Sequence, residues 1–287
     1  GMDMGMLTDR YKEFITLLQE LVEEGKVPMA RIDDAVTRIL RVKFAMGMME
    51  AKPDLWPNKE LQPEFGSAGH RKVARQAVAE SVVLLKNDNA LLPVKKLPRR
   101  IHVAGSGADD LGMQCGGWTI GWQGDRGDLT PGGTTILDAL KAVAGNTTEV
   151  NFTAEGSKCE GADLGIVVVG EGPYAEMKGD RYDLALSPED TAAVAALKAA
   201  GLPVVVVVLS GRPMILGDVA DQADAILAAW LPGTEGAGVV DVLTGAAPAT
   251  GKLSFAWPRS MDQVPLGHQR ETIENPLYPL GFGLGYE

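Results

Sequence analysis

Short apolar runs without alternation dominate the second half of the chain. The run 165–170 and the run 203–210 are apolar at nearly every position, so both faces of each strand are expected to be covered, as in a parallel sheet. Further strands are predicted near 100–105, 148–154 and 225–230. Helical patterns separate them over 134–145, 188–200 and 235–243. This alternation predicts an α/β fold with a mostly parallel sheet.

The N-terminal part has a different pattern. Residues 7–24 and 29–46 carry apolar stripes at helical spacing, and Gly25 and Gly47 end the two predicted helices. Two helices cannot form a domain alone, so their apolar faces need a partner. The proline-containing stretch 51–69 is predicted to be a linker, and a helix is predicted over 70–87.

Composition narrows the function classes. The net charge of −11 and the pI near 4.9 argue against nucleic acid or an anionic membrane as the main partner. Cys115 and Cys159 lack the spacing of a metal site, so no structural zinc is expected, and one disulfide between them is possible. The longest apolar run, 204–209, is too short to span a bilayer.

Several familiar motifs are incomplete. In "HVAGSGADDLG" the third glycine of a dinucleotide fingerprint is replaced by Asp110, and no clean capped helix is expected after it. Ser210 follows a predicted strand without a GxSxG context. None of the histidines, His70, His102 and His268, has the context of a catalytic base, and His102 is expected in the core. Nucleotide binding and serine hydrolysis are therefore disfavoured.

Two polar loops remain as candidates. The stretch "GEGPYAEMKGD" follows the buried strand 165–170 and brings Glu171 and Glu176 to the edge where ligands bind in such sheets, although a solvated loop with a capping carboxylate is equally compatible. In "CGGWTIGWQGD", Trp118 and Trp122 either fill core space or offer flat rings on which a sugar can stack. The pair of tryptophans among glycines favours the sugar.

Several ordered segments carry a family resemblance. They are "ARIDDAVTRILRVKFAMGMME", "ARQAVAESVVLLKNDNALLPV", "CGGWTIGWQG", "GEGPYAEMKGD", "AAWLPGTEGAGVVDVLTGAAPATGKLSFAWPRSMDQVP" and "YPLGFGLGYE". Together they resemble the C-terminal half of a glycoside hydrolase family 3 β-glucosidase, with the β-D-glucan exohydrolases as the nearest group. The resemblance covers nearly the whole chain.

The resemblance implies an N-terminal (β/α)8 barrel followed by an (α/β)6 sandwich, with the active site between them. Residues 1–50 would be the end of the barrel, 51–69 the linker and 70–287 the sandwich. The family's nucleophile, an aspartate followed by tryptophan, would lie upstream, since this chain contains no "DW". In the pattern E-x-K-G-D the acid/base glutamate matches Glu176. The tryptophan under the leaving-group sugar matches Trp122, with Trp118 shaping the same loop.

The resemblance thus predicts a β-glucosidase or exo-β-glucanase that releases terminal β-D-glucosyl residues with retention. Its partners would be a β-glucoside or β-glucan oligosaccharide and the barrel half, with no nucleic acid, membrane, metal or cofactor. This chain alone is expected to be inactive, and secretion or a periplasmic location is expected. The alternatives are a non-catalytic carbohydrate-binding domain and a structural domain.

Overall fold

The computed structural model describes residues 2–51, 56, 58–266 and 273–286. The chain forms two compact units, Gly1–Phe65 and Gly66–Glu287. The predicted domain boundary lies within residues 51–69, and the division between the units also falls there.

The first unit is built on two helices. Helix α1 (Tyr11–Glu23) and helix α2 (Met29–Ala45) confirm the two predicted amphipathic helices, and a short turn, η1 (Gln62–Glu64), follows. Neither helix contains a buried residue. The apolar side chains left exposed include Tyr11, Phe14, Ile15, Leu17, Leu21, Val36, Leu40, Val42 and Phe44. Most of each apolar stripe is therefore exposed within this unit.

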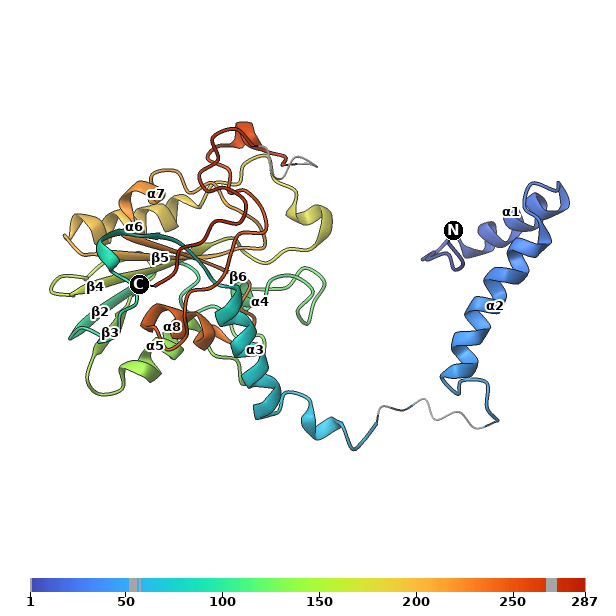
Figure 1. The fold of residues 1–287 in the computed structure, drawn as a ribbon, viewed down its shortest axis with the longest axis horizontal. Coiled ribbons are helices and arrows are strands. Elements are labelled where there is room, and N and C mark those ends of the chain that lie inside the picture. Colours follow the sequence, from blue (N-terminus) through green and yellow to red (C-terminus); the bar gives the residue numbers. More distant parts are fainter. Residues whose placement is uncertain (1, 52–55, 57, 267–272, 287) are drawn as a thin grey trace. The chain divides into compact units, whose positions relative to one another are not determined.

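The second unit contains a six-stranded sheet in the order β1-β6-β5-β4-β2-β3 (Figure 1). The strands are β1 (Val83–Asn87), β2 (Arg100–Ala104), β3 (Glu149–Phe152), β4 (Leu164–Gly170), β5 (Val204–Leu209) and β6 (Ala225–Trp230). All neighbours pair in parallel except β1, which is antiparallel to β6. The predicted α/β fold with a mostly parallel sheet is confirmed.

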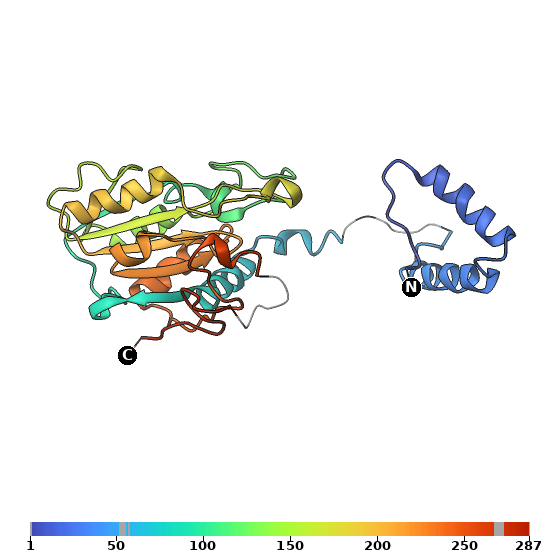
Figure 2. The ribbon, with the colours of Figure 1, turned by 90° about the horizontal axis from the view of Figure 1, so that it is seen from above.

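Helices cover both faces of this sheet. Figure 1 shows α3 (Ala68–Ser81), α5 (Ile136–Ala144) and α8 (Gly236–Thr244) on one face, and α6 (Pro188–Ala199) and α7 (Val219–Gln222) on the other. The C-terminal segment runs along the β1 edge, where Leu284 bridges to Leu84 (Figure 2). Strands β4 and β5 therefore bury side chains on both sides, which explains their lack of alternation.

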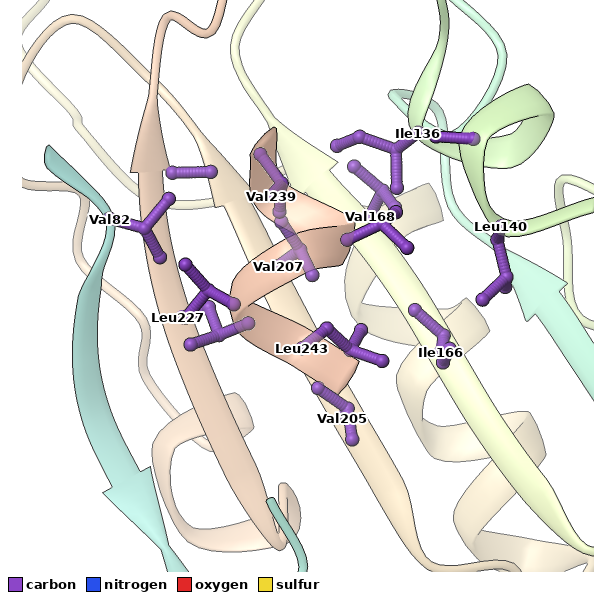
Figure 3. Close-up of a cluster of buried hydrophobic side chains, with 14 of the residues drawn as sticks. Val82, Ile136, Leu140, Ile166, Val168, Val205, Val207, Leu227, Val239 and Leu243 are labelled. Atoms are coloured by element: carbon purple, nitrogen blue, oxygen red, sulfur yellow. The ribbon is translucent and has the colours of Figure 1, made fainter. Parts of the chain in front are cut away.

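Two apolar clusters form the core, one on each face. Figure 3 shows the first, in which Val168 and Val207 of the sheet meet Val239 of α8. The second cluster contains Val167 and Val206 from the opposite face of the same strands, with Trp257 fully buried among them. Neighbouring residues of one strand thus belong to different clusters, as the two-residue period of a strand requires.

The predicted helix 70–87 is wrong in its second half. Helix α3 ends at Ser81, and 83–87 is strand β1. Residues 82–85 are all buried. A helix that packs through one face cannot bury four consecutive residues, whereas a strand packed between two apolar clusters buries every position. Pairing with β6, which aligns Val83 with Ala228, supplies the backbone hydrogen bonds.

Two smaller expectations are also corrected. The Asp110 side chain accepts a hydrogen bond from the Met113 amide at 2.9 Å and caps a short helix, α4 (Leu111–Cys115), where no capped helix was expected. The possible disulfide is absent in the described part of the chain, because Cys115 and Cys159 are both free. Within the same described residues, no helix is long and apolar enough to cross a bilayer.

Candidate functional site

The order of the strands creates a topological switch point between β2 and β4. The next strand after β2 in the chain is β3, which lies on the outer side of β2, whereas the next strand after β4 is β5, on the opposite side. Connections that leave two adjacent parallel strands in opposite directions define the switch point at which such sheets bind ligands. The loops that follow β2 and β4 are the two candidate loops of the sequence.

A buried carboxylate fixes the start of both loops. Asp190, on α6, is 1% exposed and accepts hydrogen bonds from the amides of Ser106 at 3.0 Å and Gly170 at 3.1 Å. It also accepts one from the Ser106 hydroxyl at 3.1 Å. Sequence reasoning missed Asp190. The available signal was the "SPED" helix start, in which Ser187 caps the Asp190 amide at 3.1 Å.

The loop after β2 exposes its two tryptophans. Trp118 is 69% exposed and Trp122 is 45% exposed, so neither fills the core of this unit. The Trp118 amide donates to the Trp122 carbonyl at 2.9 Å, and the ring centroids lie 6.4 Å apart at 55°. The loop thus presents two indoles on one tight turn.

This tryptophan loop packs directly on the loop after β4. Gly117 lies against the Tyr174 carbonyl, since a Cβ there would be 2.0 Å from that oxygen. The Gln123 side-chain oxygen accepts a hydrogen bond from the Ala175 amide at 3.0 Å. A glycine is needed at 117 for this close approach. The two candidate loops are therefore one connected structure.

Glu176 begins the turn η3 (Glu176–Gly179) and is exposed. Its backbone has a φ of +51°, a left-handed conformation that costs a residue other than glycine of order 1 kcal/mol. The neighbouring residues Met177 and Lys178 are exposed as well. The turn therefore exposes the Glu176 carboxylate, and the preceding residue, Ala175, is bonded to the tryptophan loop.

Glu171 lies in the opposite environment. Its side chain is 4% exposed, and its Oε2 accepts hydrogen bonds from Nε and Nη2 of Arg212 at 3.2 and 2.9 Å. The Tyr174 hydroxyl donates to Oε1 at 3.1 Å, and Arg181 lies 3.6 Å from Oε2. Burial, together with the Glu171 charge, raises the pKa of Tyr174 to about 12, so this hydroxyl stays protonated and remains a donor. Glu171 is an anchor for the loop, whereas Glu176 is exposed, as is Asp180 at the end of the same loop.

Ser210 and the histidines, which the sequence disfavours as catalytic residues, are placed as follows. The Ser210 hydroxyl is buried and donates to the Arg212 carbonyl at 2.6 Å. His102 is in the core as predicted, 3.0 Å from the Thr153 hydroxyl, and burial lowers its pKa. His70 is exposed on α3, and His268 lies outside the described residues.

Metal binding finds no support in the described ranges. Among residues 2–51, 56, 58–266 and 273–286, no group of three or more His, Cys, Asp or Glu side chains could hold an ion. Burial raises the pKa of the Cys115 thiol, which favours the neutral form over a thiolate ligand.

The fold and the site define a class: an α/β domain whose switch-point loops present two indole rings and an exposed carboxylate. In comparison with known proteins, residues 82–286 match the glycosyl hydrolase family 3 C-terminal domain. The chain belongs to glycosyl hydrolase family 3 and contains the C-terminal domain of that family.

Relatives and a solved structure extend the match. The chain is 32% identical to the "Lysosomal beta glucosidase" of Dictyostelium discoideum and 33% identical to the "Periplasmic beta-glucosidase" of Salmonella typhimurium, with all of this chain aligned in both cases. It spans only 38% and 44% of those proteins. A mutant of the exo-1,3/1,4-beta-glucanase of a Pseudoalteromonas species has a TM-score of 0.88 and 38% identity, covering 100% of this chain and 48% of that one.

Proposed function

We propose that this chain is the C-terminal part of a β-glucosidase or exo-β-glucanase that removes terminal β-D-glucosyl residues with retention of configuration. The observation that carries the proposal is the contact between the tryptophan loop and the Glu176 loop, because two exposed indole rings and an exposed carboxylate then lie on loops that pack on each other. Family membership and the names of the relatives support the same reaction class.

Glu176 is proposed as the acid/base. Retaining glycosidases use two carboxyl groups about 5–5.5 Å apart. One attacks the anomeric carbon and forms a glycosyl–enzyme ester, while the other gives its proton to the departing oxygen. In the second step the carboxylate that gave its proton now takes a proton from water. The water attacks the anomeric carbon, breaks the ester and releases the sugar. The exposed Glu176 is free to reach a substrate, whereas Glu171 is held by Arg212 and Tyr174.

Trp122 is proposed as the surface on which the leaving-group sugar stacks, with Trp118 shaping the same loop. Indole rings offer a flat apolar face to a sugar, and their N–H groups can bond to hydroxyls. Both side chains are exposed in this unit, as such a role requires.

The attacking carboxylate is proposed to come from an N-terminal (β/α)8 barrel. The dipeptide "DW" of the family's nucleophile segment does not occur in this chain. Helices α1 and α2 carry uncovered apolar stripes, and residues 1–50 are proposed to be the end of that barrel, whose remaining helices and strands would cover them. The whole enzyme is proposed to be secreted or periplasmic, in line with the periplasmic relative.

A second candidate is carbohydrate binding without catalysis. The exposed tryptophans favour it independently, because stacking requires neither Glu176 nor a nucleophile. In that case the whole protein would bind β-glucan oligosaccharides and release no glucose.

Glucose release by the complete wild-type protein separates these candidates, and Glu176→Gln then tests the acid/base assignment. With methyl β-glucoside or cellobiose, whose leaving groups need a proton, kcat/KM should fall by roughly 10²–10⁴-fold. With a dinitrophenyl β-glucoside, kcat/KM should change little. The exposed Glu189 on α6 provides the control variant, Glu189→Gln, which should behave as wild type on both substrates. An equal loss on both substrates for Glu176→Gln, or wild-type activity, would overturn the assignment.

A further inference from the structure

The backbone on both sides of Glu176 is fixed, although Glu176 itself is exposed. Before it, the Ala175 amide donates to Gln123 at 3.0 Å, and the Tyr174 carbonyl lies against Gly117. After it, Gly179 is buried at the end of the turn η3. A left-handed φ at Glu176 is unfavourable by itself, so these flanking contacts must maintain it.

The Tyr174 side chain connects the turn to buried charged groups. Its hydroxyl donates to Glu171 at 3.1 Å, and the Arg212 guanidinium lies 4.6 Å from the centroid of its ring. Gly179 touches the same ring so closely that a Cβ at this position would lie 2.1 Å from Cδ2 and 2.4 Å from Cε2. One phenol ring therefore contacts the residue that ends the Glu176 turn and the charged groups below it.

Those charged groups, Glu171 and Arg212, lie at the carboxyl ends of two neighbouring strands. Glu171 directly follows β4, and its amide donates to the Leu209 carbonyl of β5 at 3.1 Å. Arg212 follows β5 and binds Glu171 at 2.9 Å. The position of the Tyr174 ring is consequently set by the ends of two central strands, whose residues are almost all buried.

We propose that Tyr174 is a positioning residue for Glu176. Its ring is held by residues that follow β4 and β5, and it packs against the turn 176–179, so it fixes the position of that turn relative to the sheet. The inference rests on the proposed acid/base role of Glu176. General acid catalysis depends on the distance between the carboxyl group and the leaving oxygen, and a misplacement of about 1 Å can cost up to about 100-fold in rate. Tyr174 touches no substrate in this scheme and acts only through the turn.

Two variants of the complete enzyme disturb this contact in different ways. Gly179→Ala drives a methyl group into the Tyr174 ring, so that the ring or the turn must move. Tyr174→Phe keeps the ring and removes only the hydrogen bond to Glu171. The matched control is Gly172→Ala in the same loop, where an added Cβ would meet no atom within 4 Å and the backbone is not left-handed.

The assay compares kcat/KM on methyl β-glucoside with kcat/KM on a dinitrophenyl β-glucoside. Gly179→Ala should lose about 10–100-fold on the first and less than about 3-fold on the second, because only the first needs the acid. Tyr174→Phe should show a smaller loss in the same direction, and Gly172→Ala should match wild type. In a Glu176→Gln background, Gly179→Ala should cause no further loss on methyl β-glucoside, since there is no acid left to misplace.

Equal losses on both substrates, or the same loss in the Glu176→Gln background, would overturn the positioning role and leave Tyr174 as a purely structural residue. The Glu176→Gln variant alone reports on the proposed function. If it shows the leaving-group dependence and Gly179→Ala does not, only the positioning role fails. If it shows none, the acid/base assignment fails first.

Discussion

Breaking the buried ion pair between Glu171 and Arg212 should destabilise the fold strongly, and Glu171→Gln tests this. The substitution keeps the shape of the side chain and removes its charge, so Arg212, whose side chain is 25% exposed, loses its partner in a largely buried place. Removing one member of a fully buried pair costs about 3–5 kcal/mol. Because Arg212 keeps some contact with water and the amide oxygen still accepts one hydrogen bond, we expect a loss of about 2–3 kcal/mol here.

The matched control is Glu149→Gln. Glu149 pairs with Arg100 at 3.1 Å, but both side chains are about half exposed, at 56% and 45%, and such pairs contribute little. Urea unfolding of the chain, at a concentration at which sedimentation shows a monomer, gives the free energies of unfolding; it is followed by far-UV circular dichroism and by tryptophan fluorescence, to which the buried Trp257 contributes. Urea is preferred to guanidinium chloride because it does not screen charges. A loss below about 0.5 kcal/mol for Glu171→Gln, the usual range of a surface substitution, would refute the reasoning.

Further predictions concern the sugar surface, the uncovered helices and the response to pH. In the complete enzyme, Trp122→Ala should weaken oligosaccharide cleavage by about 1–2 kcal/mol while the Tm is unchanged; a lower Tm with equal loss on every substrate would indicate core packing instead. This chain alone should not hydrolyse aryl β-glucosides and should self-associate in sedimentation experiments through α1 and α2, and robust turnover by the purified chain would contradict the need for a barrel. The pKa values of Tyr174 and Tyr278 are both raised to about 12, mainly by burial, so their contribution to stability is complete below pH 10 and is lost as the pH rises through 12. Thermal melts across this range should show a falling Tm, and a flat profile would contradict the burial of these phenols.

The sequence predicts those features whose cause is local. Strands β4 and β5 are predicted because their apolar runs lack alternation, and the loop that carries Glu171 and Glu176 is predicted because the polar residues follow such a run. The strand β1 is not predicted, because the apolar run in "AESVVLLKN" fits a helix as well as a strand. Only the pairing with β6 in the folded chain distinguishes the two.

The contacts that build the site are tertiary and left no local signal. Asp190 lies 84 residues from Ser106 and 20 from Gly170 in the chain, yet it binds both amides. The contact of Gly117 with Tyr174, and that of Tyr174 with Arg212, join loops that follow different strands. A pattern within one segment cannot reveal such pairs, so Tyr174 and Arg212 could be identified only from the folded chain.

The central claim is that Glu176 acts as the acid/base, and azide tests it most directly. In Glu176→Gln, a dinitrophenyl β-glucoside should still form the glycosyl–enzyme ester, which then accumulates because no base activates water. Azide needs no base. It should attack the anomeric carbon, displace the ester carboxylate and restore turnover, giving β-glucosyl azide identified by nuclear magnetic resonance. Failure of azide to raise the turnover of Glu176→Gln, an α-glucosyl azide product, or azide rescue of Glu171→Gln with Glu176→Gln near wild type would contradict the account.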